Sequence, residues 1–329
     1  MSSMSSIEPA LSSFPGNLAV ILVFYLALPR LLAVLPQKIQ FIAKCLIVLT
    51  ATFLMSVAGC FVAIVCALLQ KRYAINYVVA RIFSYIACRP CGVTFNIVGE
   101  EHLENTPAIV VCNHQSSMDM MVLGRVFPMR CVVMAKKELQ YFPFLGIFMT
   151  LSNAIFIDRK NHKKAIESTT QAVADMKKHN SGIWIFPEGT RSRLDTADLL
   201  PFKKGAFHLA IQSGLPILPI VSAGYNHIYD SAKRSFPGGE LEIRVLEPIP
   251  TTGMTADDVN DLMERTRAVM LKNLKEMDVN SLAVSSKPSL SVDELKSAPA
   301  LKQEAKSTAV VEEEGVSYDS VKKRKTVKA

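Results

Sequence analysis

The sequence predicts an α/β fold in which a mostly parallel sheet is flanked by helices, preceded by an N-terminal transmembrane helical hairpin. Two observations lead to this prediction. Between residues 93 and 275, short apolar runs alternate with longer segments of helical periodicity, which is typical of layered α/β domains. Ahead of them, residues 17–70 contain two long apolar segments, and half of all 329 residues are hydrophobic.

The two apolar segments differ in how well they suit a bilayer. Residues 1–16 are rich in Ser and are expected to form a flexible N-terminus. The first apolar segment, Leu18–Leu35, is interrupted by Pro29 and Arg30, so it is open whether it spans fully. The second, Cys45–Leu69, has 25 residues and no charge, more than the ~20 that a bilayer requires. We expect this hairpin to anchor the chain in a membrane.

Basic residues suggest the orientation of that anchor. Lys71, Arg72, Arg81 and Arg89 follow the second segment, whereas the N-terminal tail has no lysine or arginine. Positive charges favour the cytosolic side, so we expect the remainder of the chain to face the cytosol. Residues 71–92 mix aromatic and aliphatic side chains with arginines, which predicts an amphipathic interfacial linker. A helix that packs on the main domain is the open alternative.

Charge and cysteine content narrow the function classes. The net charge is +8, and the basic residues are spread along the chain, which favours membrane surfaces and phosphate-bearing partners over nucleic acid. Seven cysteines, an odd number, indicate reduced thiols rather than a disulfide framework. Cys88 and Cys91 form a lone Cys-x-x-Cys without a second pair of ligands for zinc. We therefore expect free or palmitoylated thiols and no metal site.

The main domain is predicted to cover residues 93–280, followed by a disordered tail at 281–329 that is rich in Ser, Lys and Glu. The expected strands are Val93–Val98, Ala108–Cys112, Cys131–Ala135, Ala154–Ile157, Ile183–Phe186, Ile217–Val221 and Leu241–Leu246. The expected helices are Ser116–Val126, Lys163–Lys178, Lys204–Gln212 and Thr255–Lys275. In such sheets, functional sites gather at the carboxyl ends of the strands.

One strand end carries the residue types of a general base. The run Ala108–Cys112 stops at Asn113, His114 follows at once, and Asp119 comes five residues later at the start of the next helix. A carboxylate that holds one imidazole nitrogen leaves the other nitrogen free to accept a proton. On its own, this spacing fits an ordinary histidine equally well, so other motifs have to decide.

A second strand end suits an anion. The run that ends at Phe186 continues as Pro-Glu-Gly-Thr-Arg-Ser. Gly189 would let backbone N–H groups approach an anion, and Arg191 offers a planar fork that matches phosphate. Arg159 follows a third strand end in the same way.

Together, four stretches resemble the glycerolipid acyltransferases, and within them the 1-acylglycerol-3-phosphate acyltransferases. The matching motifs are Asn-His-x4-Asp at 113–119, Phe-Ile-Asp-Arg at 156–159, Phe-Pro-Glu-Gly-Thr-Arg-Ser at 186–192 and Leu-Pro-Ile-Leu-Pro-Ile-Val at 215–221. They occur in the family's order over about residues 93–275. A single motif would be weak, but four in order are specific.

The resemblance implies a direct acyl transfer in residues 93–280. His114, oriented by Asp119, would take the proton from the sn-2 hydroxyl of lysophosphatidic acid, which then attacks the thioester of acyl-CoA to give phosphatidic acid. The residues that it assigns to the acceptor are Lys136, Arg159 and Arg191 for the phosphate, and Glu188, Gly189 and Thr190 for the surrounding turn. It implies no cofactor, because acyl-CoA is a co-substrate. The remaining expected partners are membrane lipids, and the expected location is the endoplasmic reticulum membrane.

Three alternatives stay open. The acceptor could be another lysophospholipid or glycerol 3-phosphate, although enzymes for the latter often carry Gly-Gly-Arg-Ser where this chain has Gly189 and Thr190. A serine hydrolase built on Ser116 or Ser117 would lack the Gly-x-Ser-x-Gly turn that exposes its nucleophile. A catalytically silent membrane scaffold would not require His114. No phosphate-binding loop or dinucleotide motif implies ATP or NAD.

Overall fold

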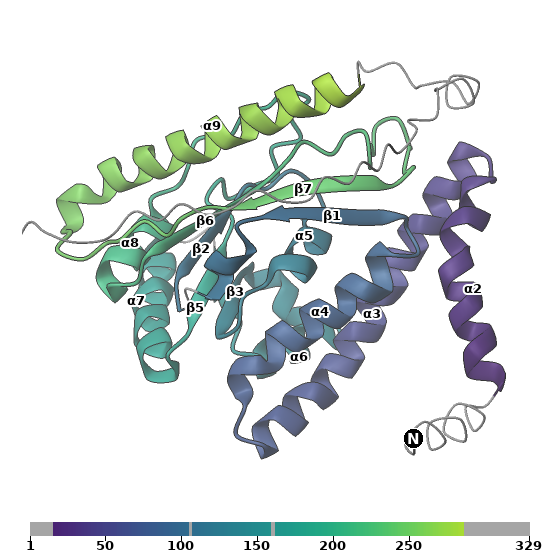
Figure 1. The fold of residues 1–329 in the computed structure, drawn as a ribbon. Helices are drawn as coiled ribbons and strands as arrows, with labels where there is room; N and C mark the ends of the chain where they lie inside the picture. The colour runs from purple at the N-terminus through teal and green to yellow at the C-terminus, as the bar shows by residue number, and fades with distance from the viewer. Residues whose placement is uncertain (1–15, 105–106, 159–161, 286–329) are drawn as a thin grey trace, which may run out of the picture. The chain divides into compact units, whose positions relative to one another are not determined.

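The computed structural model describes residues 16–104, 107–158 and 162–285 (Figure 1). Their strands are β1 (Val93–Val98), β2 (Ile109–Cys112), β3 (Cys131–Lys136), β4 (Ile155–Ile157), β5 (Gly182–Ile185), β6 (Ile217–Ser222) and β7 (Gly239–Val245). These strands form one sheet in the order β1-β7-β6-β2-β5-β3-β4. Every pairing is parallel except that of β6 with β7. The predicted mostly parallel sheet is confirmed.

Helices cover both faces of this sheet (Figure 1). They are α2 (Gly16–Ala33), α3 (Gln37–Leu68), α4 (Ile75–Cys88), α5 (Asp119–Val126), α6 (Leu145–Leu151), α7 (His162–His179), α8 (Gly205–Ser213) and α9 (Val259–Ser285). Short 3-10 turns η1 (Arg72–Ala74), η2 (Glu100–Glu104), η3 (Lys137–Tyr141) and η4 (Ala256–Asp258) connect them.

The central strand β2 explains why the sequence reads as a continuous apolar run. Its four residues are all buried, because alternate side chains enter different cores. Val110 and Cys112 join the core beneath α4 and α5, whereas Ile109 and Val111 join the core beneath α7, α8 and α9. The strand is thus fixed on both faces, and this holds its carboxyl end, where His114 follows, in a defined place.

The N-terminal region contains two helices, and one of them meets the requirements of a membrane span. Among the described residues, α3 is the helix that is long and apolar enough to cross a membrane. It begins at Gln37, before the uncharged run predicted from Cys45. Its buried stripe, which includes Val48, Ala51 and Met55, joins the core around α4. α2 contains Pro29 and Arg30, and a transmembrane hairpin stays a prediction.

Lys44 ties α3 to the domain. The side chain is buried, and its Nζ donates a hydrogen bond of 2.7 Å to the carbonyl oxygen of Pro237, just before β7. It also lies 5.4 Å from the ring centre of Phe236. A buried ammonium group is stable only when it is paired in this way. The helix is therefore packed against the domain and not merely attached to it by the chain.

Three details differ from the sequence-based expectations. α6 was not predicted, since seven residues give too little periodicity. The main body of the predicted linker is α4, whose side with Val79 and Phe83 is buried against the domain, so the packing alternative describes this face. α9 continues to Ser285, which corrects the expected start of the tail at 281. The rest of the tail lies outside the described residues.

Candidate functional site

The predicted site residues follow the carboxyl ends of parallel strands. His114 comes two residues after β2, and the turn that contains Glu188 and Gly189 comes directly after Phe186 at the end of β5. Lys136 is the last residue of β3. Because β2, β5 and β3 are parallel neighbours, these groups share one edge of the sheet. Arg159 lies outside the described residues.

His114 and Asp119 form a hydrogen-bonded pair. Nδ1 of His114 donates to Oδ2 of Asp119 over 2.5 Å. The imidazole ring stacks on Phe186 at 4.1 Å between ring centres, with an angle of 20° between the planes. No described residue makes a hydrogen bond with Nε2, and one fifth of the His114 side chain is exposed. The ring is held on one edge and one face while its second nitrogen remains open to a substrate.

Asp119 is buried, and both of its carboxylate oxygens accept hydrogen bonds. Besides His114, its Oδ2 accepts the backbone N–H groups of Gln115 at 2.8 Å and Ser116 at 3.1 Å. Its Oδ1 accepts the hydroxyl of Tyr225, which lies 2.9 Å from the hydroxyl of Ser116. Burial, and then the charge of Asp119, raises the pKa of Tyr225 well above its usual value, so this phenol is protonated and donates. These bonds occupy both oxygens of the Asp119 carboxylate and fix its direction.

The buried side chain of Glu188 binds backbone N–H groups and is not exposed to a substrate. Its side chain is buried, with Oε1 accepting the backbone N–H of His114 at 2.7 Å and Oε2 accepting that of Leu200 at 3.0 Å. Burial raises the pKa of this carboxyl, while the two hydrogen bonds act in the opposite direction. A further bond of 2.7 Å runs from the backbone N–H of Ser192 to the carbonyl oxygen of His114. The motif after β5 therefore fixes the motif after β2.

The neighbouring amides tie β2 to β6. Asn113 exchanges two hydrogen bonds with the backbone of Ser222, of 2.9 and 2.8 Å. The amide of Gln115 donates to the carbonyl oxygens of Ser222 and Ala223 at 3.0 and 2.9 Å. These contacts explain why an asparagine precedes His114: only a side chain with both a donor and an acceptor can replace the ladder where the strand ends.

Two of the predicted phosphate ligands, Lys136 and Arg191, lie at the same edge, and neither side chain makes a hydrogen bond with His114. Lys136 pairs with Glu138 at 3.0 Å, and both side chains are about half exposed. Arg191 is exposed and forms no ion pair with a described acid. Burial raises the pKa of Tyr229, and the charge of Arg191 acts in the opposite direction. Next to Arg191, Gly189 has φ +70°, and the side chain of Lys203 fills the space where a Cβ would lie. Thr190 is exposed in this turn.

Sequence reasoning missed Tyr225 and Lys203. Tyr225 is 106 residues from Asp119, so no local spacing connects them. The available signal was its position three residues after β6, at the same sheet edge as the other motifs. Lys203 lies in a Pro-Phe-Lys-Lys-Gly stretch that resembles the family, and its backbone N–H donates to Pro187 at 2.8 Å.

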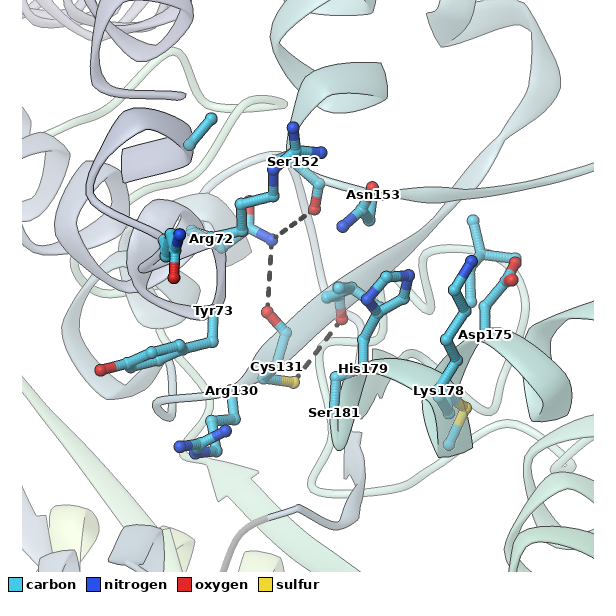
Figure 2. A pocket seen from close by; sticks show the side chains of 16 residues that line it. Arg72, Tyr73, Arg130, Cys131, Ser152, Asn153, Asp175, Lys178, His179 and Ser181 are labelled. Atoms are coloured by element: carbon cyan, nitrogen blue, oxygen red, sulfur yellow. Dashed lines mark hydrogen bonds between the residues drawn. The ribbon is translucent and has the colours of Figure 1, made fainter. Parts of the chain in front are cut away.

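A cavity of about 430 Å³ lies at the opposite, amino edge of the strands (Figure 2). Its lining includes the basic residues Arg72, Arg130, Lys178 and His179. The helices α3, α6 and α7 all end beside it, and cations next to helix C-termini offset the partial negative charge there. Asp175, its acidic lining residue, is engaged by Gln171 at 3.1 Å. The helix C-termini therefore account for the basic residues of this cavity, and no imidazole–carboxylate pair is found among its described lining residues.

Within the described ranges, no group of three or more His, Cys, Asp or Glu residues is arranged to hold a metal ion. The seven cysteines are free, and burial raises the pKa of Cys88 to about 12. A thiol with this pKa is protonated at neutral pH and is a poor metal ligand.

Comparison with known proteins gives a consistent result. A sequence model described as Acyltransferase matches residues 94–223. The 1-acyl-sn-glycerol-3-phosphate acyltransferase of Saccharomyces cerevisiae is 39% identical over 228 residues, which are 68% of this chain and 75% of that relative. The 1-acyl-sn-glycerol-3-phosphate acyltransferase alpha of Homo sapiens is 40% identical over 190 residues, which are 57% of this chain and 66% of that relative.

A solved structure supports the fold. The crystal structure of the 1-acyl-sn-glycerophosphate (LPA) acyltransferase PlsC from Thermotoga maritima superimposes with a TM-score of 0.62 at 24% identity, and covers 74% of this chain and 98% of that one. The sequence relatives, together with the shared fold, identify the chain: it belongs to the glycerolipid acyltransferase family.

Proposed function

We propose that this protein is a membrane-bound enzyme that transfers a fatty acyl group from acyl-CoA to the sn-2 hydroxyl of lysophosphatidic acid, giving phosphatidic acid. The observation that carries the proposal is the His114–Asp119 pair, with Nε2 of His114 open to substrate at the sheet edge. The relatives' printed activity supports the choice of acceptor.

In this mechanism, Nε2 of His114 accepts the proton of the acceptor hydroxyl as its oxygen bonds to the thioester carbonyl carbon. Asp119 stabilises the imidazolium that forms, because its carboxylate is already held in place by hydrogen bonds. The tetrahedral intermediate then collapses, the carbon–sulfur bond breaks, and the imidazolium returns its proton to the departing thiolate of coenzyme A. Since a thiolate leaves readily, the reaction needs no covalent acyl-enzyme.

The acceptor phosphate would bind at the basic rim of the same edge. We assign this role to Arg191, Lys136 and Arg159, with Gly189 and Thr190 shaping the turn beside them. Arg191 is exposed there without an acidic partner among the described residues, which leaves its guanidinium available. Glu188 positions the backbone instead. The proposed location is the endoplasmic reticulum membrane, with this edge facing the cytosol.

A second candidate acceptor is another lysophospholipid or glycerol 3-phosphate. The test is acyl transfer by the purified full-length chain with acyl-CoA and a panel of these acceptors. We expect lysophosphatidic acid to give the highest kcat/KM, and His114→Ala to abolish transfer while His227→Ala, which changes an exposed histidine, retains it. A preference for lysophosphatidylcholine would contradict the proposed acceptor. A folded His114→Ala variant with full activity would refute the mechanism, and an inactive unmodified chain would favour a scaffold.

A further inference from the structure

Lys203 lies against the turn that follows β5, yet the proposed function gives it no role. Its backbone N–H donates to the carbonyl oxygen of Pro187 at 2.8 Å, which fixes the segment before α8 on this turn. If Gly189 carried a Cβ, that atom would lie 2.7 to 2.8 Å from Cδ, Cε and Nζ of Lys203. The lysine side chain therefore extends across Gly189, and its ammonium group lies beside the turn that also carries Thr190 and Arg191.

The ammonium group of Lys203 is not neutralised by the acid of this turn. Glu188 is buried, and both of its oxygens accept backbone N–H groups. Lys203 is exposed and forms no ion pair with an acid in the part of the chain that the structure describes. Because its methylene groups already pack over Gly189, less side-chain freedom remains to be lost when the ammonium group binds an anion. Lys203 is thus a positioned cation that is available to a ligand.

The charge of the proposed acceptor suggests which ligand this cation serves. Lysophosphatidic acid ends in a phosphate monoester, which carries a charge of about −1.5 to −2 near neutral pH. Lys136 is paired with Glu138 at 3.0 Å, so its charge is partly compensated within the protein. Arg191 supplies one uncompensated positive charge at the turn. A doubly charged phosphate is matched by a second such cation, and Lys203 lies at the turn that carries Arg191.

We propose that Lys203 binds the acceptor phosphate together with Arg191 and makes the site selective for a phosphate monoester. When a headgroup is esterified to the phosphate, as in lysophosphatidylcholine, the phosphate keeps only one negative charge and attracts the second cation less strongly. The ammonium group of a lysine suits this role because it is a compact point charge, whereas the arginine fork fixes the direction of the phosphate oxygens. The inference rests on the proposed function, because it names a residue that selects the acceptor of that reaction.

The first test compares lysophosphatidic acid with lysophosphatidylmethanol, in which a methyl ester removes one negative charge of the phosphate. Lys203→Met removes the ammonium group but keeps an unbranched side chain to cover Gly189, and Lys204→Met changes the exposed neighbouring lysine as the matched control. We expect the ratio of kcat/KM for lysophosphatidic acid to kcat/KM for lysophosphatidylmethanol to fall about 10- to 100-fold in Lys203→Met. The ratio should be unchanged in Lys204→Met and largely restored in Lys203→Arg, which keeps the charge. Equal losses with both acceptors would show that Lys203 only supports the turn, and would overturn the proposal.

A second comparison separates the acceptor phosphate from the phosphates of coenzyme A. It uses acyl-CoA and acyl-pantetheine, a thioester donor without phosphate groups. We expect the ratio of kcat/KM for these two donors to be the same in Lys203→Met as in the unmodified chain. A ratio that falls in Lys203→Met would assign Lys203 to coenzyme A and overturn the proposal.

A binding measurement distinguishes a failure of this inference from a failure of the proposed function. Calorimetry with the full-length chain in detergent micelles, without a donor, gives Kd for lysophosphatidic acid and for lysophosphatidylmethanol. If the unmodified chain transfers no acyl group but prefers lysophosphatidic acid about 10-fold or more, and Lys203→Met loses this preference, the proposed function fails and the inference stands. If the unmodified chain transfers acyl groups and Lys203→Met keeps the preference, the inference fails and the proposed function stands.

Discussion

Tyr225 donates its hydroxyl hydrogen to the oxygen of Asp119 that His114 leaves free. The phenol draws negative charge away from the carboxylate and therefore moderates how strongly Asp119 holds a protonated imidazole. We expect Tyr225→Phe to keep the packing of the ring but to lower kcat/KM about 10-fold near neutral pH. Steady-state kinetics of the purified variant check this loss. Tyr77→Phe, which changes a phenol on α4, is the control and should leave kcat/KM unchanged.

Asp119→Asn tests the carboxylate without emptying its place. In the structure, the two oxygens of Asp119 accept hydrogen bonds from four donors. The asparagine amide has only one acceptor oxygen and carries no charge, so His114 would lose its charged partner. We expect turnover to fall by about 10²–10⁴. Asp119→Ala should also lower the free energy of unfolding by about 1–3 kcal/mol, since it leaves buried donors unpaired. Single-turnover assays and thermal unfolding check these two effects separately.

Glu188 should make stability depend on pH. Burial raises its pKa above the ordinary 4.5, so the folded state binds this proton more tightly than the unfolded state. The corresponding stability is fully present below about pH 4.5 and decreases as pH rises through the folded pKa. The Tm of the unmodified chain relative to Glu188→Gln should therefore fall as pH rises across this window. A difference in Tm that stays constant from pH 4 to 7 would show that Glu188 is not raised in this way.

Arg191→Lys tests the acceptor phosphate. A lysine keeps the charge but loses the bidentate fork, and one charge-assisted hydrogen bond is worth roughly 1.5–3 kcal/mol. We expect kcat/KM for lysophosphatidic acid to fall about 10- to 100-fold, with little change in the KM for acyl-CoA. Arg265→Lys on the exposed side of α9 is the matched control. A defect confined to acyl-CoA would instead assign Arg191 to coenzyme A.

Local patterns were sufficient to predict most elements of the fold. The strands β2, β5 and β6 are short apolar runs, and their burial on both faces produces that pattern. The antiparallel pairing of β6 with β7 was not predicted, because strand direction depends on the path of the connecting chain. The helix α6 was missed because its sequence has no amphipathic period. Phe144 and Gly146 form a tight turn at its start, and Phe144 is exposed there.

The site shows the same division between local and distant relationships. His114 and Asp119 are five residues apart and meet across a single strand-to-helix turn, so their spacing was informative. Tyr225 reaches Asp119 only because β6 lies beside β2, and no sequence pattern encodes that neighbourhood. Glu188 was expected near the acceptor, yet it is buried and bonded to the backbone of His114. Which atoms a carboxylate meets is decided by packing, which residue type alone does not reveal.

The hydrogen bond from Lys44 to Pro237 has a mechanical consequence. An enzyme joined to a membrane anchor by a flexible linker samples many heights and orientations, and only some of them bring its active site to a lipid substrate. In this chain α3 is packed into the domain, with Val48 and Met55 in the domain core. The helix and the domain therefore move as one body. If α3 is embedded in a membrane, as in the proposed function, its packing on the domain fixes the distance from His114 to the lipid surface. Membrane thickness and curvature would then change turnover directly.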